Sequence, residues 1–291
     1  MGGYDYIIAD LHLRSTADLV ALGLRSFRPF EAMASNAIPD CSFEILDEIT
    51  FDENAIIKEL YSSYMSESNT DGALYKTDSG YLYSISKREL QAESLLFNIE
   101  TDKWRITTNF SAYKFDVAML RFGLWIAFGL LLVKSRAIAM HSSSVVHNGR
   151  GVLFLGESGT GKSTHTRLWC ESIANTHLLN DDSPIVRFVN DELRVYGSPW
   201  SGKRPCYKAE SYPIAAFCRL SQAPENRIKR LSTIATIGAL LPSTPPQFAA
   251  DAELQDAMLA TLSKIIERVP TYHLECLPNS EAAQLSHNTI F

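Results

Sequence analysis

Basic residues are few in this chain, and they do not cluster. The 291 residues include 27 Lys and Arg against 33 Asp and Glu, which gives a formal net charge of −6. No run of Lys and Arg is longer than two residues. A basic surface is what attracts nucleic acid or an acidic membrane. We therefore expect no nucleic-acid partner and no membrane partner.

Long apolar runs and paired cysteines are also scarce. The most apolar stretch, FGLWIAFGLLLV at 122–133, rises only about 18 Å as a helix against a hydrocarbon core of ~30 Å, which favours a buried helix. The N-terminus shows no signal-peptide pattern. The five cysteines are scattered, without a Cys-x-x-Cys pair, as is typical of reduced thiols. These features predict a cytoplasmic protein.

The residue pattern changes near residue 110. Before it, short alternating runs, with YIIADLHLR as one strand, predict a small meander of antiparallel strands, and 53–72 has room for one helix. After it, strands alternate with helices, which is typical of the α/β class. We predict a β-rich N-terminal domain at 1–110, which docks an acceptor or braces its neighbour, and an α/β domain at 111–291.

A glycine-rich loop, GESGTGKST, follows the apolar run 152–155 and precedes a helical pattern. It matches the P-loop pattern G-x-x-x-x-G-K-[ST] in the strand–loop–helix setting that this motif needs. Glycines let the backbone amides turn towards an anion, the lysine reaches terminal phosphates, and the hydroxyl after it can ligate Mg²⁺. The predicted nucleotide-binding residues are Gly156, Glu157, Ser158, Gly159, Thr160, Gly161, Lys162, Ser163 and Thr164.

A hydrolase interpretation of the same segment fails. A nucleophile elbow, G-x-S-x-G, would centre on Ser158 and would need glycine where Thr160 stands. The histidines show neither an H-E-x-x-H pattern nor another close ligand spacing, so a zinc site is not expected. The predicted chemistry therefore concerns a nucleotide and Mg²⁺.

A carboxylate pair, Asp181 and Asp182, ends the run HLLNDD soon after the loop. The short gap leaves room for one helix and one strand, so the pair lies at the end of the next strand. One carboxylate can hold Mg²⁺ with Ser163 while the other accepts a proton from an attacking hydroxyl. The sequence leaves open which aspartate has which role. A solvated turn before Ser183-Pro184 is the alternative for this pair.

The stretch from His141 to about Arg227 resembles the HPr kinase/phosphorylase catalytic domain and, more distantly, the nucleotide site of ATP-dependent phosphoenolpyruvate carboxykinase. GESGTGKST, LLNDD and the upstream His141 carry the resemblance. It implies an α/β fold of the P-loop carboxykinase-like superfamily with a mixed sheet, ATP and Mg²⁺ as cofactors, and a homo-oligomer. It also implies a phosphate- and metal-binding role for Lys162 and Ser163, an acid–base and metal role for the aspartates, and a place near the reacting phosphate for His141.

The segment YGSPWSGKRP differs from the HPr kinase signature that follows the aspartates. Lys203, Arg204 and Arg227 are candidate cations for an anionic acceptor, with an exposed basic surface as the alternative. The pattern predicts an ATP- and Mg²⁺-dependent kinase with a hydroxyl acceptor, a serine of a protein, a peptide or a small metabolite. A nucleotide-binding regulatory module and a carboxykinase- or phosphorylase-type reaction stay open as alternatives.

Overall fold

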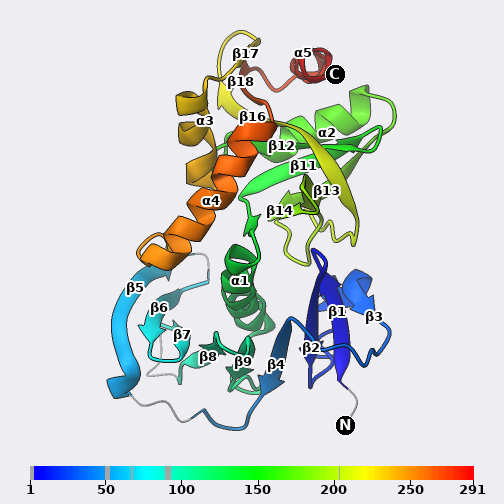
Figure 1. Cartoon of the computed structure of the whole chain (residues 1–291). Helices are drawn as coiled ribbons and strands as arrows, with labels where there is room; N and C mark the ends of the chain where they lie inside the picture. Colours follow the sequence, from blue (N-terminus) through cyan, green and yellow to red (C-terminus); the bar gives the residue numbers. More distant parts are fainter. Residues whose placement is uncertain (1–2, 50–52, 67, 89–92, 203) are drawn as a thin grey trace. The chain divides into compact units, whose positions relative to one another are not determined.

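The structure is a computed structural model that describes residues 3–49, 53–66, 68–88, 93–202 and 204–291 (Figure 1). The chain divides into two compact units. Unit 1 is Met1–Lys134 with Gln247–Gln255, and unit 2 is Ser135–Pro246 with Asp256–Phe291. The first segment of unit 1 ends at Lys134 and not near residue 110, where the residue pattern changes. The reason is that the helix Val117–Lys134 contacts strands of unit 1.

Within the described residues, unit 1 contains one nine-stranded sheet in the order β3-β1-β2-β4-β9-β8-β7-β6-β5. The β2–β4 and β4–β9 pairs are parallel and the other pairs are antiparallel, so the sheet is mixed rather than a simple antiparallel meander. Its elements are β1 (Tyr4–Ile8), β2 (Leu11–Ser15), η1 (Arg25–Phe30), β3 (Glu31–Ala32), β4 (Cys41–Ile45), η2 (Glu53–Ala55), β5 (Ile56–Met65), β6 (Thr70–Thr77), β7 (Gly80–Lys87), β8 (Leu95–Glu100) and β9 (Arg105–Thr108).

Two local expectations for unit 1 are wrong. YIIADLHLR is a hairpin rather than one strand, because Ala9 and Asp10 take φ angles of 53° and 59° and reverse the chain between β1 and β2. The helix expected within 53–72 is limited in the described residues to the short 3₁₀ turn η2, and β5 pairs with β6 instead. The run IIKELYSSYM is rich in β-branched and aromatic residues, which favour a pleated surface when a partner strand is available.

Helix α1 (Val117–Lys134) packs on β7 and β8 of unit 1. Gly123 lies so close to the Phe97 ring that a side chain there would overlap it. The helix has 18 residues, longer than the apolar run that predicted it, and by length and composition it passes the test for a membrane span. Since 67% of Val117–Lys134 is buried inside the protein, we interpret α1 as a core helix of unit 1.

Unit 2 contains a second mixed sheet, ordered β10-β14-β15-β16-β12-β11-β13, with β18 beside β16 and β17 beside β18. The β12–β16 and β16–β18 pairs are parallel. Its elements are β10 (Ala137–Ala139), β11 (Ser142–His147), β12 (Arg150–Leu155), α2 (Lys162–Ser172), β13 (Thr176–Asp182), β14 (Ile185–Val189), β15 (Glu192–Tyr196), β16 (Ser211–Gln222), β17 (Arg227–Arg230), α3 (Thr233–Leu240), η3 (Leu241–Ser243), most of α4 (Ala252–Arg268), β18 (Thr271–Cys276) and α5 (Ser280–Ile290). The short η4 (Pro246–Phe248) begins at the last residue of one unit 2 segment and continues into unit 1, which also includes the start of α4 up to Gln255.

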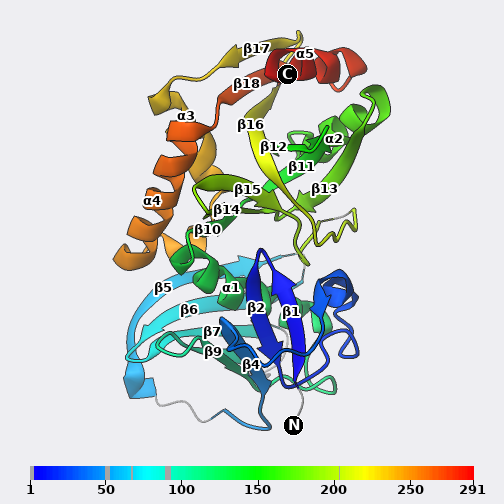
Figure 2. The same ribbon diagram turned by 45° about the vertical axis from the view of Figure 1, so that its right-hand side comes forward.

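Unit 2 combines strands and helices, as the α/β prediction expects, but the two do not alternate throughout, because β13 to β17 follow one another without an α-helix between them. Figure 2 shows α2 beside β11 and β12. Trp169 of α2 is fully buried against Phe154 of β12, with ring centroids 5.4 Å apart. This packing fixes α2 on the sheet, and with it the loop that joins β12 to α2.

Candidate functional site

The loop between β12 and α2 has the backbone that its glycines predict. Gly156, Gly159 and Gly161 have φ angles of 150°, 84° and 102°, which other residues rarely adopt. A Cβ on Gly156 would also come within 2.5 Å of Thr160 Oγ1. The Thr160 hydroxyl donates to Glu157 O at 2.7 Å and closes the loop on itself. Gly161 is the N-cap of α2, so the amides at the start of this helix face the loop.

Lys162 folds back over this loop. Its Nζ donates to Gly156 O at 2.8 Å and to Glu157 O at 3.2 Å, and lies 3.0 Å from His141 Nε2. Because an ammonium only donates, Nε2 of His141 is the acceptor in this contact. Burial lowers the pKa of Lys162, and the charges of Asp182 and Asp181 act in the opposite direction. The ammonium therefore lies in the loop, held by the carbonyl groups of Gly156 and Glu157.

The two aspartates have different partners. Asp181 is buried, and its Oδ1 accepts from Ser163 Oγ at 2.9 Å. Asp182 is half-exposed, and its Oδ1 lies 3.2 Å from His141 Nδ1. The structure thus brings the loop lysine, its following serine, both aspartates and His141 together at one site.

The backbone at Asp182 is held in an unusual conformation. Its φ of 149° lies in a region that costs a non-glycine residue on the order of 1–3 kcal/mol, and such residues gather at functional sites. Gly202 N donates to Asp181 O at 2.6 Å, and Asp182 forms a bridge with Ser201. A Cβ on Gly202 would lie 3.0 Å from Asp181 O, so the close approach favours glycine.

Asn180, which precedes the pair, fixes the segment that follows it. Its Nδ2 donates to Trp200 O at 3.0 Å, and its Oδ1 accepts from Ser183 N at 2.9 Å. Asn180 is fully buried, so its amide has to find such partners inside the protein. Sequence reasoning missed both Asn180 and Gly202. An asparagine directly before the aspartate pair was the available signal for the first, and the second had none.

The three predicted acceptor-binding cations have different outcomes. Arg204 lies near the first turn of α2, where its Nη1 donates to Ser163 O at 3.4 Å. Arg227 lies on β17, where its guanidinium pairs with Glu225 at 2.9 Å on the exposed surface. Lys203 lies outside the described residues. Only Arg204 of these three is therefore joined by a described contact to the loop–helix segment.

A cavity of about 590 Å³ adjoins the loop on the α2 side of the sheet. Gln222, at the end of β16, donates from Nε2 to Gly159 O at 3.2 Å and links the cavity wall to the loop. The lining residues are Gly159, Thr160, Gly161, Thr164, His165, Leu220, Gln222, Ala223, Cys276, Leu277 and Pro278. Its wall is largely apolar and has room for a small flat ligand beside the glycine-rich loop. Sequence analysis did not find the β16 and β18 residues, because they lie far from the loop in the chain.

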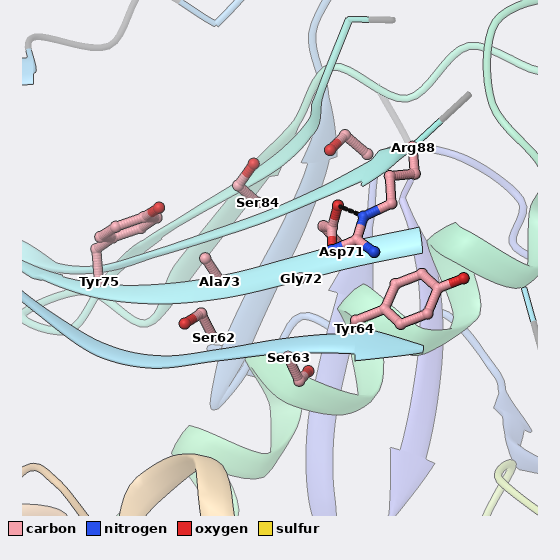
Figure 3. A pocket seen from close by; sticks show the side chains of 10 residues that line it. Ser62, Ser63, Tyr64, Asp71, Gly72, Ala73, Tyr75, Ser84 and Arg88 are labelled. Carbon is pink, nitrogen blue, oxygen red and sulfur yellow. Dashed lines mark hydrogen bonds and ion pairs between the residues drawn. The ribbon is translucent and has the colours of Figure 1, made fainter. Parts of the chain in front are cut away.

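A second cavity, of about 480 Å³, lies in unit 1 on β5, β6 and β7. Figure 3 shows hydroxyl-bearing and small side chains along these strands, and an ion pair between Arg88 Nε and Asp71 Oδ2 at 3.0 Å. The Arg88 guanidinium also lies over the Tyr64 ring, 4.1 Å from its centroid. This cavity is a polar groove whose charged groups already neutralise each other, so the site in unit 2 is the stronger candidate for phosphate chemistry.

The donor atoms of the unit 2 site fit a hard cation. Ser163 Oγ and Asp181 Oδ1 are oxygen donors already at hydrogen-bond distance. Within the described ranges, no three His, Cys, Asp or Glu side chains gather as a ligand set of their own. Mg²⁺ commonly takes one or two protein oxygens and completes its shell with water and substrate phosphates. The two donors therefore fit Mg²⁺ bound together with a nucleotide.

No protein-family model and no curated protein matches this chain. Among solved structures, the chain is similar to the Hpr(Ser) kinase/phosphatase from Coxiella burnetii, at 14% identity and a TM-score of 0.31. The match covers 52% of this chain and 86% of that chain. This is a distant likeness of fold.

Proposed function

We propose that this protein is an ATP- and Mg²⁺-dependent kinase that transfers a phosphoryl group to a hydroxyl acceptor, a serine of a protein, a peptide or a small metabolite. One observation carries the proposal. Lys162 contacts His141, and His141 in turn contacts Asp182. Ser163, the residue after Lys162, contacts Asp181. We assign Ser163 and Asp181 as the metal-binding pair, and His141 and Asp182 as the pair that accepts the proton. A phosphate grip, a metal site and a base are the parts that phosphoryl transfer needs.

The nucleotide would extend from the cavity to the loop. Its base would lie against Leu220 and Leu277 in the cavity, and its phosphates would meet the amides at the start of α2. Lys162 would exchange its carbonyl partners for phosphate oxygens, because an ion pair with a phosphate is stronger than hydrogen bonds to neutral carbonyls. That exchange also frees Nε2 of His141.

Ser163 and Asp181 would hold Mg²⁺. When bound, Mg²⁺ neutralises negative charge on the phosphates during transfer. Asp181 suits this role better than Asp182, because its carboxylate already shares a hydrogen bond with the Ser163 hydroxyl and is buried at the base of the site. The geometry thus supports a division of roles between the aspartates that the sequence left open.

Asp182 and His141 would take the acceptor proton. The acceptor oxygen forms a bond to the γ-phosphorus, the bond from that phosphorus to the β,γ-bridging oxygen breaks, and ADP leaves with the electron pair. The proton of the acceptor hydroxyl passes to the Asp182 carboxylate, or to Nε2 of His141 with Asp182 holding Nδ1. General-base assistance of this kind contributes about 10²–10⁴-fold in rate.

The test is transfer of label from γ-labelled ATP with Mg²⁺, with free serine, a mixed serine-peptide library and a protein extract as acceptor probes. We expect labelled product with the wild-type protein and none with Lys162→Ala, which should keep its near-UV circular dichroism because the Lys162 ammonium lies at a loop rather than in the core. Undiminished transfer by a folded Lys162→Ala would falsify the assignment. Tight ATP binding without labelled product from any probe would instead identify a nucleotide-binding regulatory module.

A further inference from the structure

We propose that Arg219 binds the terminal phosphoryl group of the nucleoside triphosphate, as a second cation beside Lys162. This inference rests on the proposed function, because it needs a nucleotide in the phosphate loop. Arg219 lies outside the loop motif and the aspartate pair. Its role follows from the place that β16 gives it in the sheet.

Arg219 lies beside the end of β12. Its Cα pairs with that of Leu155, the residue directly before the loop. Its chain neighbours Cys218 and Leu220 pack into the core that includes Trp169 of α2. Because successive side chains of a strand point to opposite faces, Arg219 points to the other face, where its Nη1 donates to Ala239 O of α3 at 3.4 Å.

This alternation separates two functions along β16. Leu220 and Gln222 line the cavity on the α2 side, where the proposed nucleobase lies. Arg219 is on the opposite side of the strand and cannot line that cavity. Its side chain instead lies on the face of the sheet where α3 lies.

Three side chains that are cationic or carry an imidazole lie next to the glycine-rich loop: Arg219, Lys162 and His141. Arg219 Nη2 lies 4.0 Å from Glu157 Oε1, and the backbone carbonyl of the same Glu157 accepts from Lys162 Nζ at 3.2 Å. His141 N donates at 2.8 Å to the carbonyl of Ser243, which ends the turn after α3. Arg219 and Lys162 therefore flank Glu157 on the side of the site where His141 lies.

The present partners of Arg219 hold it only loosely. One is a carbonyl at 3.4 Å, and the other is the Glu157 carboxylate, whose side chain is 83% exposed. A guanidinium presents a planar set of donors that matches a phosphoryl group, which carries more charge than one solvated carboxylate. On nucleotide binding, Arg219 exchanges Glu157 for the γ-phosphoryl oxygens. There it stabilises the charge that spreads over those oxygens during transfer, as an arginine supplied in cis does in other phosphoryl-transfer enzymes.

The test compares the affinities of the full chain for ATP and ADP, in buffer with Mg²⁺, by titration calorimetry. We expect Arg219→Gln to weaken ATP binding about tenfold to one hundredfold, the size of a lost hydrogen bond to a charged group, with ADP binding changed by less than about twofold. Arg219→Lys should restore part of the ATP affinity. Arg167→Gln is the matched control, since Arg167 lies on the exposed face of α2 and pairs with Glu171.

An equal loss for ATP and ADP, or an unchanged ratio of the two affinities, would overturn the proposal, because an arginine that only anchors α3 cannot distinguish the nucleotides. If Lys162→Ala abolishes ATP binding while Arg219→Gln leaves that ratio unchanged, the Arg219 proposal fails and the proposed function stands. If the wild-type protein binds neither nucleotide, both fail together.

Discussion

The hydroxyl of Ser163 donates to Oδ1 of Asp181 at 2.9 Å, and this contact joins the first turn of α2 to the end of β13. Helix α2 separates the two residues in the chain, and they meet in space because β13 pairs with β11, which in turn pairs with β12. The contact brings a hydroxyl oxygen and a carboxylate oxygen to one point beside the glycine-rich loop.

Replacing Asp181 with asparagine should make ATP binding insensitive to Mg²⁺. Asparagine keeps the shape and one oxygen of the side chain but removes its charge, so we expect Mg²⁺-dependent ATP affinity to fall on the order of tenfold to one hundredfold. With EDTA present, affinity should stay equal or rise, because one negative charge near the phosphates is gone. Calorimetric titrations with and without Mg²⁺ measure both effects.

Asp191→Asn is the control for this variant, since Asp191 lies in an exposed turn where it pairs with Arg268. If Asp181→Asn lowers the ATP affinity by the same factor with Mg²⁺ and with EDTA, the metal assignment is contradicted. It would indicate instead that Asp181 supports the loop through its hydrogen bond with Ser163.

Asp182→Asn and His141→Gln should slow the chemical step while leaving nucleotide binding nearly intact. Asp182 and His141 contact each other at 3.2 Å, and His141 contacts Lys162 at 3.0 Å, so the two side chains form one chain of contacts. We expect kcat to fall about 10²–10⁴-fold for Asp182→Asn. Rapid-quench measurement of a single turnover separates this loss from ATP affinity.

The double variant provides the internal control for the proton-accepting pair. If Asp182 and His141 act as one unit, the loss in the double variant should be close to that of Asp182→Asn alone, because residues that act together are not additive. Losses that multiply would show that the two side chains act independently. Normal turnover of both single variants would exclude this pair as the proton acceptor.

The sequence predicted the parts of the site that are local in the chain. GESGTGKST specified its own backbone through Gly156, Gly159 and Gly161, and the short gap to LLNDD placed the aspartates at the end of the next strand, which is β13. The sequence could not show which aspartate faces Ser163, because that depends on how β13 pairs with β11. Gln222 and Arg219 were missed for a similar reason, since they meet the loop only through the parallel pairing of β12 with β16.

The helix expected within 53–72 shows how tertiary pairing overrides a local pattern. IIKELYSSYM has apolar and aromatic residues at spacings that suit either structure, and no local signal in it excludes a helix. The partner strand β6 decides between the two, because it satisfies the backbone groups of β5 along most of its length. Its hairpin partner β7 follows immediately, so the three strands form from neighbouring segments.

His165 should make the stability of the protein depend on pH. His165, on α2, is buried beside Trp169, whose Nε1 lies 3.2 Å from His165 Nε2, and burial lowers the pKa of this histidine from 6.5 to about 4. In the unfolded chain the imidazole regains its ordinary pKa. Between pH 6.5 and about 4 the unfolded state therefore binds a proton that the folded state does not, and the folded state loses stability as the pH falls.

The loss assigned to His165 should approach roughly 3 kcal/mol at the acid end of that window. Urea unfolding at a series of pH values from 7 to about 4 measures it. His165→Gln keeps an acceptor for Trp169 but cannot be protonated, so its free energy of unfolding should fall less steeply over this range. Identical slopes for His165→Gln and the wild type would show that His165 is not the group whose protonation opposes folding.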